Sequence, residues 1–189
     1  NKRDAFLFKM YQAFGHHFDF IAIPIIKKRL RMDTSQVIIN EERPQLTKHL
    51  ATRFKEKIGQ NVNLLGEVVL GNEEADHRYH HYLEALESPD INYISVKISG
   101  IYAQTHALNY EESFPELVSR MSALYQKAID FPYTDEDRIK RSKFINLDME
   151  EYKDAHFTLR LFKAVLNLPQ FKNYSAGIVV QAYLPDAYD

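Results

Sequence analysis

The sequence predicts an α/β fold, namely a partial (β/α)8 barrel of about four parallel strands with helices between them, preceded by an N-terminal helical arm. Four short stretches with alternating apolar residues recur along the chain, as half-buried strands do. Stretches with helical periodicity separate them, and this alternation is typical of parallel βαβ units. Each strand also carries a polar residue late in its run, at the end where barrels of this kind do their chemistry.

The clearest strand is 91–99, INYISVKIS. Alternation gives one face made of Asn92, Ile94, Val96 and Ile98, and an opposite face made of Tyr93, Ser95, Lys97 and Ser99. In a barrel covered by helices, the first face would pack outward and the second would face the interior. The pattern therefore predicts that Lys97 points into the barrel near the C-terminal end of its strand.

Three other stretches repeat the pattern: VNLLGEVVL at 62–70, KFINLDME at 143–150 and GIVVQAYL at 177–184. Together the four strands supply one inward polar residue each: Glu67, Lys97, Asp148 and Gln181. Their shared parity predicts a single polar site at the barrel mouth, in which Glu67 and Lys97 form an ion pair. The alternatives are a polar plug of the barrel that binds no substrate, and an exposed lysine on a misread strand.

Helices are expected between the strands. They cover 43–59, stopped by Gly59; 72–88, capped by Asn72; 111–130, with Leu117, Met121, Leu124 and Ala128 apolar; and 157–168, with Leu159, Phe162, Val165 and Leu166 inward. We expect a long loop at 101–110 and a charged connector at 133–143.

The first 31 residues mix aromatic and basic side chains. Phe8, Tyr11, Phe14 and Phe18 recur at helical spacing, and Pro24 is expected to interrupt any continuous helix. We favour a helix that packs on protein; the alternative is a basic helix at a membrane surface. The domain prediction is an arm at 1–43 and a barrel half at 44–189.

Composition excludes several classes. Lys and Arg number 24 against 26 Asp and Glu, a net charge of -2, so nucleic acid is not an expected partner. The chain has no cysteine and no apolar run long enough to span a bilayer, and a cytoplasmic setting is expected. No dinucleotide, Walker or G-x-S-x-G motif is present. The HRYHH run at 77–81 lacks the glutamate of HExxH, so we expect a solvated helix face and no metal site.

Four motifs, VNLLGEVVLG, YISVKIS, INLDMEEYKDAHFTL and GIVVQAYLPDA, resemble the proline dehydrogenase domain of the bifunctional proline utilization A flavoenzymes. The resemblance covers residues from about 44 to the end. It implies a distorted β/α barrel that binds FAD non-covalently and oxidises L-proline to 1-pyrroline-5-carboxylate in proline catabolism. It also implies electron transfer to membrane quinones, and allows peripheral association of the parent protein with the inner face of a membrane.

The resemblance also implies residue roles. Lys97 would bind the substrate carboxylate and Glu67 would pair with active-site cations. Asp148 would order the site beside the cofactor, and Gln181 would hydrogen-bond the flavin ring edge. In such enzymes the cofactor carries the hard chemistry and the protein orients it.

The sequence stops after its fourth predicted strand, before the point at which the family has its later R-x-x-R helix and its aldehyde dehydrogenase half. We therefore expect the first half of a barrel, a fragment inactive in isolation, which binds FAD weakly or not at all and self-associates through uncovered strand edges. Two alternatives stay open: an aldolase that forms a Schiff base on Lys97, and a non-enzymatic interaction module.

Overall fold

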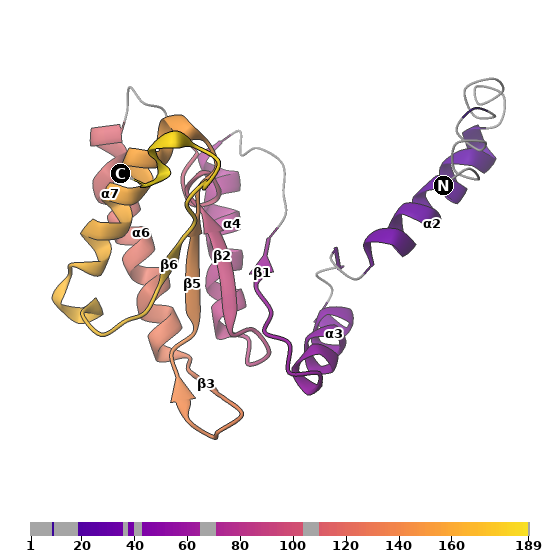
Figure 1. Ribbon diagram of the computed structural model, residues 1–189, viewed down its shortest axis with the longest axis horizontal. Helices are drawn as coiled ribbons and strands as arrows, with labels where there is room; N and C mark the ends of the chain where they lie inside the picture. The colour runs from indigo at the N-terminus through magenta and orange to yellow at the C-terminus, as the bar shows by residue number, and fades with distance from the viewer. Residues whose placement is uncertain are drawn as a thin grey trace. The chain divides into compact units, whose positions relative to one another are not determined.

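The computed structural model describes residues 9, 19–35, 38–39, 43–64, 71–103 and 110–188. The chain divides into two compact units, Asn1–His49 and Leu50–Asp189. The second unit contains the sheet (Figure 1).

The first unit contains α2, Asp19–Thr34, and the beginning of α3, Arg43–Lys55. The expected interruption at Pro24 is wrong, because α2 continues through it. Proline has a helical φ and removes only one backbone hydrogen bond, so a helix can bend and continue past it. The aromatic residues Phe8, Tyr11, Phe14 and Phe18 lie outside the described residues. Among the residues that are described, no helix is long and apolar enough to cross a membrane.

Helix α3 ends before Gly59, not at it. The amide of Lys57 donates to the Phe54 carbonyl and that of Ile58 to the Arg53 carbonyl, the bond pair of a Schellman motif. Lys57 takes the left-handed conformation with a φ of 60°. The expected stop was therefore misplaced by two residues, onto a glycine that the turn does not use.

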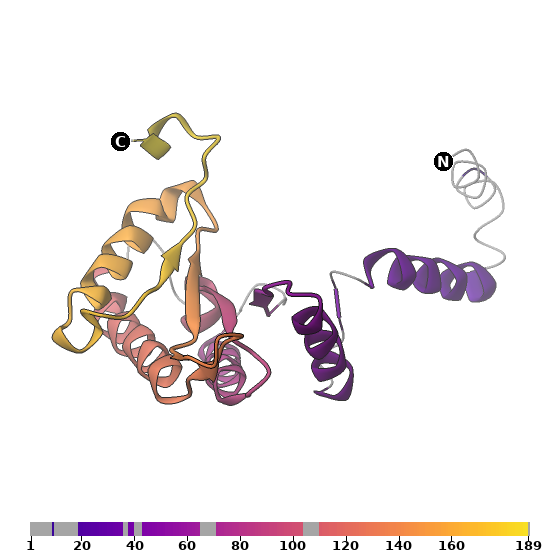
Figure 2. The same ribbon diagram turned by 60° about the horizontal axis from the view of Figure 1, so that its bottom comes forward.

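The second unit is built on a parallel sheet with the strand order β1-β2-β5-β6. The strands are β1 (Val62–Asn63), β2 (Tyr93–Lys97), β5 (Phe144–Asp148) and β6 (Gly177–Ile178). Helices α4 (Asn72–Glu87), α6 (Tyr110–Asp130) and α7 (Ala155–Leu166) cover one face (Figure 2). This is the α/β architecture that the sequence predicts, consistent with part of a barrel.

The core lies between the sheet and these helices. Ile94 and Val96 of β2 and Ile145 and Leu147 of β5 are fully buried, which confirms the predicted outward parity. Helix α6 buries the predicted set, Leu117, Met121, Leu124 and Ala128. Burial of these side chains is the main force that holds helices on the sheet.

Helix α7 buries only part of the stripe expected. Its buried apolar residues are Phe157, Leu161 and Val165. Of the predicted set, Val165 is therefore confirmed, Phe162 and Leu166 are half-buried, and Leu159 is exposed. The ring of Phe157 meets Phe114 of α6 edge-on, with 5.8 Å between centroids.

Two further local predictions are wrong. Strand β2 ends at Lys97 and a one-turn helix, α5 (Ile98–Ile101), follows in place of more strand. Asn72 is the first helical residue of α4 and Gly71 holds the cap position. The charged connector is found before β5 as expected, and it contains an antiparallel hairpin, β3 (Tyr133–Thr134) with β4 (Lys140–Arg141), which an Asp135–Arg141 ion pair closes.

The described part of the chain also contains short 3-10 turns: η3 (Tyr152–Asp154), η4 (Pro169–Phe171) and η5 (Pro185–Tyr188). Turn η4 begins at Pro169, just after α7, where the sequence predicts that the helix has stopped.

Candidate active site

The inner face of the sheet, away from the covering helices, is arranged in rows that follow the strand register. The lowest row pairs Tyr93 with Phe144, whose rings meet edge-on at 5.0 Å. The next row places Ser95 beside Asn146. The last row, at the carboxyl ends of the strands, pairs Lys97 with Asp148. The face thus changes from aromatic to amide to charged along the strands.

The Asp148 carboxylate is oriented by two amides. Asn63 of β1 donates from Nδ2 to Oδ2 at 3.3 Å, and Asn146 of β5 donates from Nδ2 to Oδ1 at 2.9 Å. Each carboxylate oxygen therefore has its own donor. Such bonds fix both the position and the plane of the group.

Lys97 has a different partner. Its Nζ lies 3.9 Å from Oε1 of Glu150, and the Lys97 and Glu150 side chains are 33% and 32% exposed. The second oxygen of Glu150 accepts the backbone N–H of Ser99 at 3.3 Å. Glu150 thus holds both the ammonium group and the first turn of α5.

The partner expected for Lys97, Glu67, lies outside the described residues, so their predicted ion pair stays a prediction. Sequence reasoning missed Glu150, Asn63 and Asn146 as members of the site. Parity could have found the two asparagines, because both share the inward face with Lys97 and Asp148.

Gly177 of β6 leaves space for the side chain of Asn146. A Cβ at this position would lie 2.5 Å from Oδ1 of Asn146 and 3.0 Å from the ring of Phe144. The Asn146 side chain therefore lies across the backbone of β6. Only glycine leaves space for it without a shift.

Gln181 does not stand on a strand. Strand β6 ends at Ile178, and Val179 adds one more bond, from its N–H to the Leu147 carbonyl at 2.9 Å. The Gln181 carbonyl accepts the N–H of Leu184 at 3.0 Å, which closes a turn. The predicted strand at 177–184 is therefore too long, and Gln181 lies past the end of the sheet.

The histidines of α4 make local contacts. The His77 and His81 rings are tilted by 48° to each other with centroids 4.3 Å apart, and Nδ1 of His80 lies 2.7 Å from the Asp76 carbonyl. Among the described residues, no group of three or more histidine, aspartate or glutamate side chains could hold a metal ion.

The sequence profile of the proline dehydrogenase family matches residues 46–189. This chain belongs to the proline dehydrogenase family. A search of curated proteins finds no match.

Solved structures of proline utilization A resemble this chain. The protein from Corynebacterium freiburgense is 39% identical over 85% of this chain and 16% of its own, with a TM-score of 0.74. The protein from Bdellovibrio bacteriovorus, inactivated by N-propargylglycine, is 29% identical over 90% of this chain and 19% of its own, with a TM-score of 0.75. The chain thus spans less than a fifth of the length of either.

Of the site residues predicted from the sequence, Lys97, Asp148 and Gln181 lie within the described residues. The structure brings Lys97 and Asp148 together at the strand ends, with Asn63, Asn146 and Glu150 as supporting groups. It places Gln181 beyond β6. Glu67 lies outside the described residues.

Proposed function

We propose that this chain supplies the first strands of an FAD-dependent proline dehydrogenase that oxidises L-proline to 1-pyrroline-5-carboxylate. The observation that carries the proposal is the row formed by Lys97 and Asp148 at the carboxyl ends of β2 and β5. Ligands of β/α barrels bind at this end of the strands. The family match supports the reaction class.

Lys97 is proposed to bind the carboxylate of proline. Its side chain is one-third exposed, and the ion pair between its Nζ and Glu150 is long at 3.9 Å. A substrate carboxylate can therefore approach Nζ without first breaking a short bond. A charge-assisted hydrogen bond of this kind orients the ring of the substrate as well as binding it.

Asp148 is proposed to order the site. The amides of Asn63 and Asn146 fix its two oxygens, so it presents a carboxylate of defined direction beside Lys97. Glu67, on the preceding stretch, is proposed to add a further acidic group toward active-site cations.

The residues present fit one edge of a flavin. Val180 and Tyr183 are 57% and 80% exposed and flank the half-buried Gln181, so apolar surface and an amide occur together just beyond β6. We propose that Gln181 hydrogen-bonds the ring edge of FAD and that Asp148 lies beside it. Bound FAD would supply the hydride acceptor, while the side chains of this chain bind and orient proline.

The wider context of the proposal follows the family. The whole protein is proposed to work in the cytoplasm, to associate peripherally with a membrane, and to pass its electrons to a quinone. In isolation, the chain is proposed to self-associate through its uncovered sheet edges and to bind FAD weakly or not at all, without proline dehydrogenase activity.

The test is a flavin absorbance spectrum and proline-dependent dye reduction by the full-length protein. We expect bound flavin and a rate that requires proline. Borohydride trapping of a carbonyl substrate on Lys97 would instead establish the aldolase alternative. If the full-length protein neither binds flavin nor reduces the dye with proline, the result would favour the other alternative, a non-enzymatic interaction module.

A further inference from the structure

The one-turn helix α5 connects the candidate site to the helices behind the sheet. It begins at Ile98, directly after Lys97, and ends at Ile101. At its start the Ser99 N–H donates to Glu150, the residue that also pairs with Lys97. The position of α5 therefore affects both the backbone of Lys97 and the position of Glu150, the ion-pair partner of Lys97.

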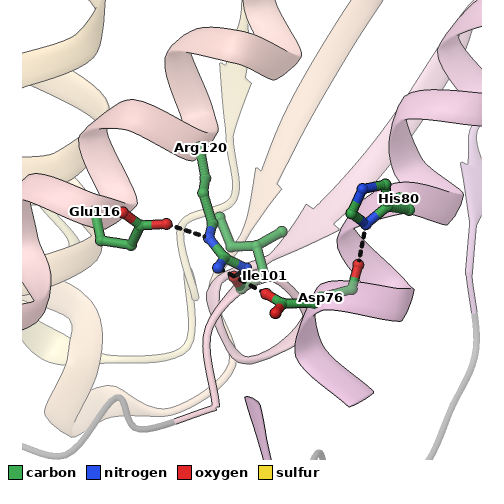
Figure 3. Close-up of polar contacts among 5 residues, drawn as sticks. All are labelled: Asp76, His80, Ile101, Glu116 and Arg120. Atoms are coloured by element: carbon green, nitrogen blue, oxygen red, sulfur yellow. Dashed lines mark hydrogen bonds and ion pairs between the residues drawn. The ribbon is translucent and has the colours of Figure 1, made fainter. Parts of the chain in front are cut away.

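Arg120 of α6 holds the other end of α5. Its Nη1 donates to the Ile101 carbonyl at 2.9 Å. Its Nε donates to Oε1 of Glu116 at 2.7 Å, and its Nη2 lies 2.7 Å from Oδ1 of Asp76 on α4 (Figure 3). All three guanidinium nitrogens are thus engaged, by α4, α5 and α6.

The environment of Arg120 suits a fixed group. The side chain is 18% exposed and its guanidinium lies 5.2 Å from the centre of the Tyr79 ring. Burial acts to lower the pKa of Arg120, but the bonds to Glu116 and Asp76 outweigh it and the net pKa is raised. Arginine is suited to such a role, because its planar fork binds several acceptors at once.

Helix α5 also has little room to move toward α4. A Cβ at Gly100 would lie 3.1 Å from the Tyr82 hydroxyl oxygen and 3.2 Å from Cδ of Arg78. Tyr82 and Ile101 are fully buried. The turn is therefore pressed against α4 on one side and bonded to Arg120 at its end.

We propose that Arg120 is a positioning residue for Lys97: by binding the Ile101 carbonyl it fixes α5, and through α5 it sets the backbone from which Lys97 reaches the substrate carboxylate. The substrate part rests on the proposed function. Without Arg120, the Ile101 carbonyl would lose a charged donor, and the Asp76 and Glu116 carboxylates would lose the cation between them. The turn after Lys97 would then open more often than the rest of the fold.

The first experiment needs no activity. Amide hydrogen exchange is compared in the full-length protein and in Arg120→Met, with Arg160→Met as the matched control. Arg160 joins α7 to Glu111 of α6 and stacks on Phe114 at 4.3 Å, so it too links two helices, at a distance from α5 along the chain. Loss of a hydrogen bond from a charged donor predicts exchange at residues 98–102 about tenfold faster in Arg120→Met.

The pattern of amide exchange decides whether Arg120 fixes α5. We expect the control to leave residues 98–102 within about twofold of the parent protein. An unchanged rate at these residues in Arg120→Met would overturn the proposal. If Arg120→Met fails to fold, Arg120→Lys is used in its place, because lysine keeps the charge but lacks the planar guanidinium. If amide exchange in Arg120→Lys becomes faster uniformly across the fold, and not selectively at residues 98–102, the proposal is also overturned.

The second experiment separates positioning from plain stability. With proline as substrate, Arg120→Met is expected to raise KM about tenfold and to leave kcat within about twofold and flavin content unchanged, because Lys97 acts in substrate binding. An unchanged KM beside faster exchange would refute the link from α5 to Lys97. A parent protein that does not oxidise proline would refute the proposed function, while the exchange result still decides whether Arg120 fixes α5.

Discussion

Lys97 and Asp148 occupy paired register positions on neighbouring parallel strands, yet each is held by other groups. Asp148 accepts the amides of Asn63 and Asn146, and Lys97 faces Glu150. The charge of Asp148 is therefore oriented without consuming the ammonium of Lys97. In the proposed function, this cation at the strand ends binds the substrate carboxylate.

The first prediction concerns Lys97→Ala in the full-length protein. We expect proline KM to rise roughly ten- to a hundredfold, because a hydrogen bond between charged groups contributes about 1.5–3 kcal/mol. Flavin content should not change. The control is Lys140→Ala on the exposed hairpin. Equal losses of flavin and proline affinity would show that Lys97 is structural.

The second prediction concerns Asp148→Ala, which removes the acceptor shared by the Asn63 and Asn146 amides. We expect turnover to fall while circular dichroism and the cooperative unfolding transition persist, because the carboxylate lies at the sheet rim and not in the core. Asn63→Ala, which removes only one of the two donors, should have a smaller effect. A variant with the turnover of the parent protein would remove Asp148 from the site.

The parts that the sequence predicted well are those in which local pattern and tertiary packing agree. Helix α6 has a long apolar stripe that packs on the sheet, and its four expected residues are all buried. The outward parity of β2 and β5 was also correct: the predicted outward residues Ile94, Val96, Ile145 and Leu147 are all fully buried, because the apolar set of each strand packs under the helices.

The parts that it missed depend on residues far along the chain. The run from Ile94 to Ser99 continues the strand pattern, but α5 begins at Ile98, where Glu150 and Arg120 supply distant partners for the turn. Glu150 becomes the neighbour of Lys97 only through the pairing of β2 with β5. No local propensity contains that information.

The third prediction concerns two glycines. Gly177→Ala should destabilise the fold by about 1–3 kcal/mol, because the new Cβ would lie 2.5 Å from Oδ1 of Asn146 and must displace it. Gly59→Ala is the matched control: nothing lies within 4 Å of its Cβ position, and its φ is not positive. It should be neutral or stabilising by up to about 1 kcal/mol. Urea denaturation of both variants checks this, and equal stability would contradict the close approach at β6.

The last prediction concerns Lys143, which directly precedes β5 and so lies at the end of this strand opposite to Asp148 and the candidate site. Its side chain is 1% exposed, and its ammonium donates to the Ser88 carbonyl at the end of α4. Burial lowers the pKa of Lys143 to about 8, although the charge of Asp90 acts in the other direction. In the unfolded chain the same group titrates near 10.5.

The sign follows from proton binding. Below pH 8 both states hold the proton and the cost of burying the charge is present. Between pH 8 and about 10.5 the folded state releases the proton while the unfolded state keeps it, so stability rises with pH, by about 3 kcal/mol in all. Above pH 10 the trend reverses, because burial raises the pKa of Tyr82 to about 12 and the unfolded chain ionises its tyrosines first.

We therefore expect the free energy of unfolding to reach its maximum near pH 10, measured by urea denaturation between pH 7 and 11. Lys143→Met should abolish the rise between pH 8 and 10, since it removes the lysine whose proton the folded state releases in that range. Lys163→Met, at an exposed position of α7, should keep the rise. A parent protein whose stability is flat or falling from pH 8 to 10 would show that Lys143 stays charged in the folded state, with the Ser88 carbonyl and Asp90 fully offsetting its burial.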